Sequence, residues 1–207
     1  IAFIGGFICI YTVGYMKGYH HHHKDVKDRQ PFFFSMLFLF LAAMFGLVLS
    51  QNLIWIYFFW EITSVISFLM IGYTRSDEAV GNSFCALWMN LLGGLGFAVA
   101  IALMAHLYGT LQLMDVVEIG ALLPLMCLSL AGLTKSAQLP FSTWLLGAMV
   151  APTPSSALLH SATMVKAGVY LLIRISPALE GNLVGIIVSS IGGLTFIMAS
   201  MMAIAQN

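Results

Sequence analysis

Long apolar segments alternate with short polar stretches along almost the whole chain. Most of these segments reach the ~20 residues that an α-helix needs to cross the hydrocarbon core of a bilayer. The pattern therefore predicts an all-α fold, a polytopic transmembrane helix bundle that forms a single domain over residues 1–207. We expect seven spans, at about residues 1–19, 32–50, 53–73, 82–107, 119–139, 152–174 and 182–205.

One of these segments is interrupted by a proline, Pro140. Proline removes a backbone donor and clashes with the preceding helical turn, so we expect the fifth span to break there and to continue over residues 141–149. A broken helix at membrane depth is tolerated only where protein or water satisfies the freed backbone groups, and transporters use such breaks to bind ions. The break is therefore a candidate functional element.

The composition agrees with a membrane protein. Hydrophobic residues make up 60% of the chain and charged residues only 8%, which is far more apolar than an average soluble domain. The formal net charge is zero, and this argues against a nucleic-acid partner, because binding to phosphate needs a basic surface. The expected surroundings are lipid and other membrane subunits.

The sequence offers little for metal or cofactor chemistry. Cys9, Cys85 and Cys127 stand in apolar runs at no metal-ligand spacing, which favours free, buried thiols. The polar run from His20 to Pro31 contains four adjacent histidines, but adjacent side chains splay around a loop and no further ligand stands at a useful spacing. Neither a phosphate-binding glycine loop nor a nucleophile with its base is present. We predict no cofactor, no metal site and no self-contained enzyme.

The basic residues predict the orientation of the bundle. If seven spans alternate across the membrane, one side carries most of the basic residues and the other side carries Arg174. The positive-inside rule then places the more basic side toward the cytoplasm, and we expect a multi-pass protein of a prokaryotic inner membrane. The residues on the basic side are Lys17, Lys24, Lys27, Arg29 and Arg75.

Two ionisable residues lie inside apolar segments at a depth where charge is costly. Glu61 stands about a third of the way along its segment, with Ser64 on the same helical face, and Lys135 stands one turn before the proline break. A lysine at the centre of a transmembrane helix costs about 2.5–3.5 kcal/mol on insertion scales, so such residues usually mark an ion or proton pathway. The alternative is that each side chain reaches out to the nearer membrane surface.

A third group of polar residues recurs along the sixth predicted span. His160, Thr163 and Lys166 follow one another at steps of three residues, which predicts one polar stripe along a helix face. An imidazole and an amine on one stripe suit a proton wire. The alternative is that His160 and Thr163 hold neighbouring helices together through hydrogen bonds.

Three sequence blocks resemble a known family. They are FWEITSVISFLMIGY around Glu61, KSAQLPFSTWLLGAM around Lys135 and APTPSSALLHSATMVKAGVYLLIR around His160. They resemble the antiporter-like proton-translocating subunits of Mrp sodium/proton antiporters, respiratory complex I and membrane-bound hydrogenases, and most closely the large A-type subunit of the Mrp antiporter. The resemblance implies that the chain is a fragment holding the third to ninth helices of a larger bundle.

The same resemblance implies roles for the four ionisable residues. Glu61 would pair with Lys135, and His160 and Lys166 would lie on the central axis of the membrane domain. We therefore predict a subunit of a Na⁺/H⁺ antiporter complex that moves protons through these four residues, with protons, Na⁺, lipid and other membrane subunits as partners. Two alternatives stay open: a proton-pumping subunit of complex I or of a hydrogenase, and a structural membrane scaffold.

Overall fold

The computed structural model describes residues 1–22 and 28–205, without the side chains of residues 20–22, 161 and 162. The predicted basic residues Lys24 and Lys27 lie outside the described residues. The described part is all-α, as predicted, and contains no strand, only an isolated antiparallel bridge between Asn52 and Gln112. The all-α part of the predicted fold is therefore confirmed.

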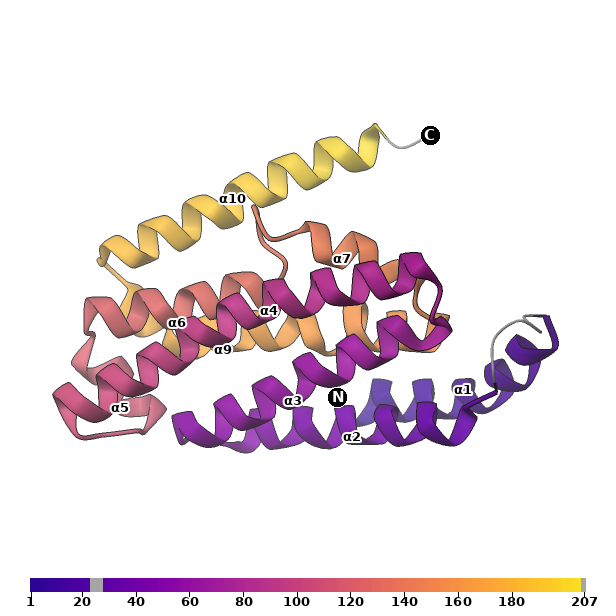
Figure 1. Cartoon of the computed structure of the whole chain (residues 1–207). Helices are drawn as coiled ribbons and strands as arrows, with labels where there is room; N and C mark the ends of the chain where they lie inside the picture. The colour runs from indigo at the N-terminus through magenta and orange to yellow at the C-terminus, as the bar shows by residue number, and fades with distance from the viewer. Residues whose placement is uncertain (23–27, 206–207) are drawn as a thin grey trace.

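Ten α-helices follow one another along the described chain (Figure 1), and four short helical segments adjoin them. The segments η1 (Gly72–Thr74) and η3 (Ala148–Val150) are 3₁₀-helical, and η2 (Met104–Tyr108) and η4 (Ala157–Ala162) are π-helical. The α-helices are α1 (Ala2–His22), α2 (Gln30–Leu49), α3 (Leu53–Ile71), α4 (Asp77–Leu103), α5 (Leu113–Ile119), α6 (Leu122–Lys135), α7 (Thr143–Gly147), α8 (Thr153–Ser156), α9 (Met164–Leu179) and α10 (Leu183–Ile204).

Fewer helices reach membrane-spanning length and hydropathy than the sequence predicts. Among the described residues, five stretches are long and apolar enough to cross a membrane, whereas seven spans were expected. The expected fifth span, 119–139, is reduced to the 14-residue α6, because Gly120 in a left-handed conformation with φ of 61° ends α5 just before it and the helix stops again at Lys135. The five stretches are Gln30–Leu49, Leu53–Thr74, Asp77–Tyr108, Thr153–Leu179 and Leu183–Ile204.

Close backbone approach joins the central helices. The helix α4 packs between α3 and α6, and α6 packs in turn on α9. A Cβ atom at Gly93 would collide with the Thr134 hydroxyl of α6, and one at Gly168 of α9 would collide with the carbonyl oxygen of Gly132. Small residues therefore let the backbones of α4, α6 and α9 approach closely, as is usual between membrane helices.

The helical structure breaks earlier than the sequence predicts. Helix α6 ends at Lys135, and α7 starts at Thr143, so Pro140 lies in a non-helical segment rather than at the point where the helix stops. The stop is made by Ala137, which has a φ of 54°: its N–H donates to the Thr134 carbonyl at 3.2 Å, and the next N–H donates to the Leu133 carbonyl at 3.0 Å. These two bonds form the Schellman motif that ends many helices.

The predicted sixth span is also irregular. Its helix starts as α8, widens into the π-helical segment η4 and is interrupted at Thr163, whose φ and ψ are −141° and −65°. There the Thr163 N–H and hydroxyl both donate to the Leu158 carbonyl, at 3.1 and 2.7 Å. Helix α9 then continues to Leu179, and the whole stretch Thr153–Leu179 is long and apolar enough to cross a membrane, as the predicted sixth span requires, although its helix is interrupted.

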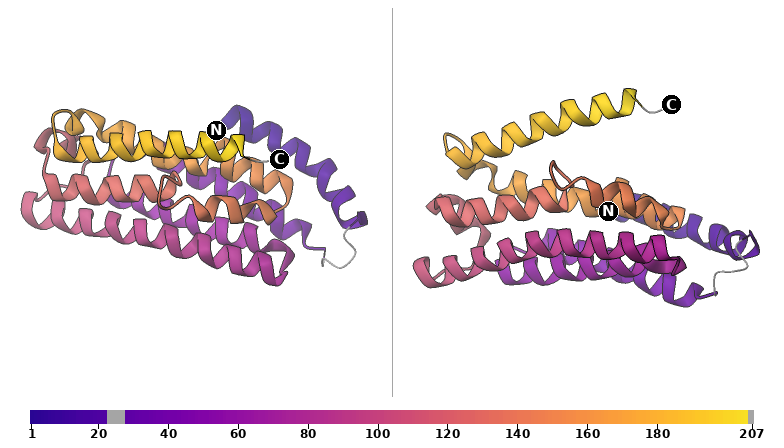
Figure 2. Two further views of the ribbon diagram at one scale, coloured as in Figure 1. Left: turned by 90° about the horizontal axis from the view of Figure 1, so that it is seen from above. Right: turned by 45° about the horizontal axis from the view of Figure 1, so that its top comes forward.

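The last helix, α10, lies apart from the bundle. Only 6% of its most apolar window is buried, and its sparse contacts are with α6 and α9. Figures 1 and 2 show α10 inclined away from the other helices, with its N-terminal end nearest to them. Large apolar side chains such as Phe196 (74% exposed) and Ile204 (85% exposed) therefore remain uncovered within this chain.

Candidate functional site: a buried lysine beside a helix break

The ammonium group of Lys135 is completely enclosed by protein. Its side chain is 0% exposed, and Nζ donates hydrogen bonds to the Trp60 carbonyl oxygen at 3.0 Å and to Ser64 Oγ at 2.7 Å. The same nitrogen lies 5.0 Å from the centre of the Trp60 ring, within the range of a cation–π interaction. Every one of these partners is electrically neutral, although a buried ammonium is usually paired with an acid.

The two oxygens that hold Lys135 belong to one face of α3. Trp60 and Ser64 are four residues apart and are both buried, at 0% and 1% exposure. The Ser64 hydroxyl accepts from Lys135 and donates to the Trp60 carbonyl at 3.2 Å, and the Thr63 hydroxyl donates to the same carbonyl at 2.7 Å. The helix break after Lys135 leaves the lysine at the end of α6, facing this oxygen cluster.

Glu61 lies next to the cluster but does not bind the lysine directly. Its side chain is half-buried and packs against Gly94 of α4, where a Cβ atom would collide with Oε1. This carboxylate oxygen is buried and has no hydrogen-bond partner among the described residues. The structure thus places Glu61 beside the residues that bind Lys135. The hydrogen bonds of the ammonium go to Trp60 and Ser64 and not to the Glu61 carboxylate.

His160 is half-buried, and its ring nitrogens have no hydrogen-bond partner among the described residues. It lies in the π-helical segment η4, and both ring nitrogens are buried. The ring lies beside the backbone of Ala148 in η3, yet neither nitrogen completes a hydrogen bond with a described residue. An imidazole in this state can accept or donate a proton as soon as water or another residue reaches it.

Lys166 differs in burial from the other members of the predicted stripe. Thr163 is 0% exposed, whereas Lys166 is exposed on the surface of α9. The π-helical turn and the irregular backbone at Thr163 change the rotation between residues, so three-residue steps no longer fall on one face. The regular helix that the predicted stripe assumes is therefore interrupted, and no hydrogen bond among the described residues joins Lys166 to Lys135.

Several polar residues near the lysine were not singled out from the sequence. Ser67 donates to the Thr63 carbonyl at 2.6 Å and contacts the Met164 sulfur at 2.8 Å, so the polar face of α3 extends from Lys135 to α9. Trp144 of α7 donates to the Thr134 carbonyl at 3.1 Å and so ties α7 to the end of α6. The available signal was the close spacing of Thr63, Ser64 and Ser67 on one helix face.

The helix break is also anchored from α10. The Leu139 N–H, which has no helical partner, donates to Thr195 Oγ1 at 3.0 Å, and that hydroxyl donates to the Ile191 carbonyl at 2.7 Å. A backbone N–H that has no hydrogen-bond acceptor inside a bilayer costs several kcal/mol of stability, as any unpaired polar group does there. Thr195 therefore supports the segment that follows Lys135.

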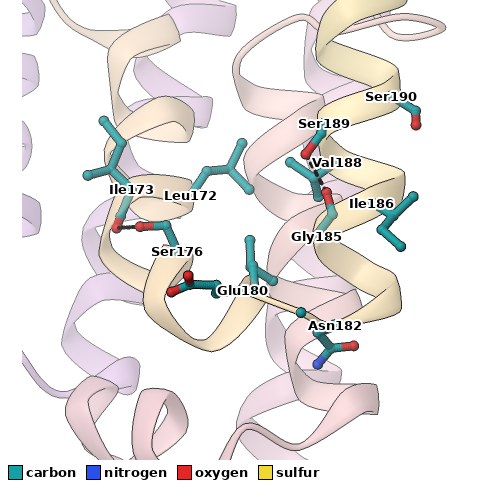
Figure 3. A pocket seen from close by; sticks show the side chains of 12 residues that line it. Leu172, Ile173, Ser176, Glu180, Asn182, Gly185, Ile186, Val188, Ser189 and Ser190 are labelled. Carbon is teal, nitrogen blue, oxygen red and sulfur yellow. Dashed lines mark hydrogen bonds between the residues drawn. The ribbon is translucent and has the colours of Figure 1, made fainter.

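A hollow between α9 and α10 lies outside this site. Its volume is about 660 Å³, and it is lined mainly by residues from Leu172 to Ser190. Figure 3 shows that the Ser176 and Ser189 hydroxyls turn back to their own helices, and they donate to the Ile173 and Gly185 carbonyls at 2.8 and 2.6 Å. The described residues contain no group of three or more potential metal-binding side chains.

Comparisons with known proteins bear on what such a site does. A family model described as "NADH:quinone oxidoreductase/Mrp antiporter, TM" matches residues 50–207. The chain is 39% identical over 217 aligned positions to a putative antiporter subunit, mnhA2, of Staphylococcus aureus strain JH9, and 38% identical to that of strain USA300. The alignments cover all of this chain but only 26% of each relative, so the chain spans about a quarter of their length.

Solved structures give a consistent result. One chain of the Mrp complex from Dietzia sp. DQ12-45-1b is 38% identical, with a TM-score of 0.65, over 69% of this chain and 17% of that one. A chain of the membrane-bound sulfane sulfur reductase, an archaeal respiratory membrane complex, has a TM-score of 0.64 over 80% of this chain and 34% of that one. Its identity is 24%, so it supports the fold alone.

The resemblance inferred from the blocks around Glu61, Lys135 and His160 is confirmed by these matches. The family match takes in all four predicted ionisable residues, and the curated bacterial relatives align along the whole chain. The chain belongs to the NADH:quinone oxidoreductase/Mrp antiporter transmembrane family.

Proposed function

We propose that this chain is the proton-translocating part of a subunit of a multisubunit Na⁺/H⁺ antiporter, with Lys135 as its central proton carrier. The observation that carries the proposal is the enclosed ammonium of Lys135, which is bound only by neutral groups and lies beside an unpartnered carboxylate oxygen of Glu61. Similarity to the putative antiporter subunit mnhA2 and to the Mrp complex supports the antiporter assignment.

The surroundings of Lys135 suit a group that changes its protonation state. A hydrogen bond to a charged donor contributes about 1.5–3 kcal/mol, and a neutral one less, so the Trp60 carbonyl and Ser64 hydroxyl hold the ammonium better than the amine. Moving one charge through a potential of 100 mV takes about 2.3 kcal/mol, which is of the same size. Closing and opening a pair with Glu61 would therefore be enough to load and release the proton.

The onward path would use His160 and Lys166. The ring nitrogens of His160 have no partner among the described residues, which suits an acceptor of a transferred proton. Lys166 is exposed in this chain, and we propose that it faces further helices of a longer polypeptide or a neighbouring subunit. In this reading the seven apolar segments are spans within a larger bundle, and the membrane subunits of the complex complete the path.

The proposal is tested by replacing Lys135 in the full-length subunit within its complex. Lys135→Ala should abolish Na⁺-dependent proton flux in membrane vesicles, because the Trp60 carbonyl and the Ser64 hydroxyl that bind its ammonium cannot carry the proton in its place. Lys17→Ala is the matched control, since Lys17 is exposed on α1 and is not among the residues that bind Lys135, and it should leave the flux unchanged.

Both outcomes are informative because assembly is measured separately. The Lys135→Ala subunit should still copurify with its partners, since the substitution removes a costly buried charge. Unchanged flux with an assembled complex would exclude Lys135 as the carrier. Flux that appears only when an electron donor is supplied would contradict an antiporter and indicate a redox-driven pump.

A further inference from the structure

A hollow of about 290 Å³ lies where three membrane helices end. It is formed at the start of α2, at η1 after the end of α3, and in the first turns of α4. In Figure 1 these three helix ends lie near the same end of the molecule. Helix ends mark the boundary between hydrocarbon and water, so the hollow opens at the level of lipid headgroups.

One side of the hollow carries an incompletely bound arginine. Arg29 donates from Nη2 to the Tyr73 carbonyl at 2.6 Å, and its guanidinium carbon lies 5.3 Å from the centre of the Tyr73 ring. The Arg29 Nε is buried and has no hydrogen-bond partner among the described residues. A buried charged donor without an acceptor is unfavourable, and an anionic group bound in the hollow would supply that acceptor.

A second arginine, Arg75, places another positive charge at the edge of the hollow. Arg75 lines the same hollow and is exposed, at a left-handed backbone position with φ of 59°. The described residues that line the hollow include no aspartate or glutamate. The described acidic residues nearest in sequence are Asp28, which accepts from the Gln30 backbone, and Asp77 and Glu78, which occupy the first turn of α4; Asp25 lies outside the described residues.

The opposite side of the hollow is apolar and faces outward. Phe32, Phe68, Leu69 and Val80 line it, and Phe32 and Val80 are 36% and 39% exposed. A ligand that fits both sides therefore has a negative group next to a hydrocarbon chain. A free phosphate ion would match only the arginines and would leave the apolar wall without a partner.

We propose that this hollow binds an anionic phospholipid, with the phosphate between Arg29 and Arg75 and an acyl chain along Phe68 and Val80. Planar guanidinium groups bind phosphate oxygens in pairs, and basic pockets between membrane helices on the cytoplasmic side are suited to anionic headgroups. The predicted orientation places this end on the more basic, cytoplasmic side. The site is separate from the lysine cluster and does not depend on the proposed transport function.

The test measures lipid retained by the purified full-length subunit in its complex. After reconstitution in vesicles of equal parts phosphatidylcholine and phosphatidylglycerol, native mass spectrometry should find phosphatidylglycerol enriched on the wild type. Arg75→Gln should lower this retention at least fivefold without loss of folding, because the Arg75 side chain is exposed. Arg29→Lys keeps the charge but loses the forked donors, and it should retain an intermediate amount.

A matched control distinguishes this site from a general attraction to charge. Arg174→Gln removes an arginine that is bound to Tyr170 near the opposite end of the bundle, and it should leave retention unchanged. Equal retention by the wild type and by Arg75→Gln would overturn the proposal. Displacement of the lipid by millimolar inorganic phosphate in the wild type would also overturn it, because it would assign the site to a soluble anion.

Discussion

At the scale of single residues, Lys135 differs from an ordinary buried cation because its partners are neutral. The Trp60 carbonyl, the Ser64 hydroxyl and the Trp60 ring surround its ammonium, while the nearest acid, Glu61, packs toward Gly94. The predicted partner of Lys135 thus lies beside its binding residues without being one of them. Small changes at Ser64 or Gly94 should therefore act on the proton carrier without removing it.

Ser64→Ala removes the shorter of the two hydrogen bonds to Lys135. A hydrogen bond to a charged group contributes about 1.5–3 kcal/mol, so we expect Na⁺-dependent proton flux to fall by roughly tenfold or more if the ammonium state is limiting. Ser64→Thr keeps the hydroxyl and should retain most of the flux. Ser35→Ala, which removes an exposed hydroxyl bound to its own helix, should have no effect. Wild-type flux in Ser64→Ala would remove this hydroxyl from the mechanism.

Gly94→Ala tests the position of Glu61 without altering either charge. The added Cβ would occupy the space of Glu61 Oε1, so the carboxylate must move and transport should fall severalfold. Gly81→Ala on the same helix adds a methyl group where no atom lies within 4 Å, and it should leave transport intact. Vesicle flux assays on both variants give the comparison, and equal flux would show that Glu61 tolerates displacement.

At the scale of elements, the break after α6 is made by local backbone conformation and is supported from outside. Ala137 adopts the left-handed conformation that ends α6, and Thr195 of α10 accepts the hydrogen bond from Leu139. Pro140 lies within the non-helical segment and keeps the helix from resuming at that point. Two uncharged residues, Ala137 and Thr195, thus fix the helix end at which Lys135 lies.

Ala137→Gly should stabilise the protein modestly. A left-handed conformation costs an alanine roughly 1 kcal/mol more than a glycine, so the transition in thermal unfolding of the purified complex should stay level or rise. Ala137→Val, with a branched side chain at the same φ of 54°, should lower it. A lower transition for Ala137→Gly than for the wild type would contradict the assigned role of this residue.

Thr195→Val tests the link between α10 and the break. The valine keeps the shape but leaves the Leu139 N–H without its acceptor, so we expect a lower unfolding temperature and reduced proton flux. Thr195→Ser keeps the hydroxyl and should behave like the wild type. Ser200→Ala, at an exposed hydroxyl bound to its own helix, is the control on α10. Identical behaviour of the valine and serine variants would show that the break does not depend on α10.

At the scale of the whole molecule, the chain combines a packed helix bundle with one helix, α10, whose surface is almost entirely exposed. The helices α3, α4, α6 and α9 enclose the lysine cluster, whereas α10 meets them mainly at its N-terminal end (Figure 2). The matched relatives are about four times as long, since this chain aligns with 26% of them. The exposed Lys166 and the apolar face of α10 accordingly lie where further helices or subunits would pack under the proposed function.

The sequence by itself determined the class, the family and the two ionisable residues of the cluster. A predominantly apolar chain with so few charges can only bury its backbone in helices within lipid, and Glu61 and Lys135 stand out because charge is costly there. The tertiary structure alone decided what Lys135 binds, because a backbone carbonyl such as that of Trp60 has no mark in the sequence. It also separated Lys166 from His160, because regular three-residue spacing predicts a shared face only in an unbroken α-helix, and the π-helical turn at η4 changes that rotation.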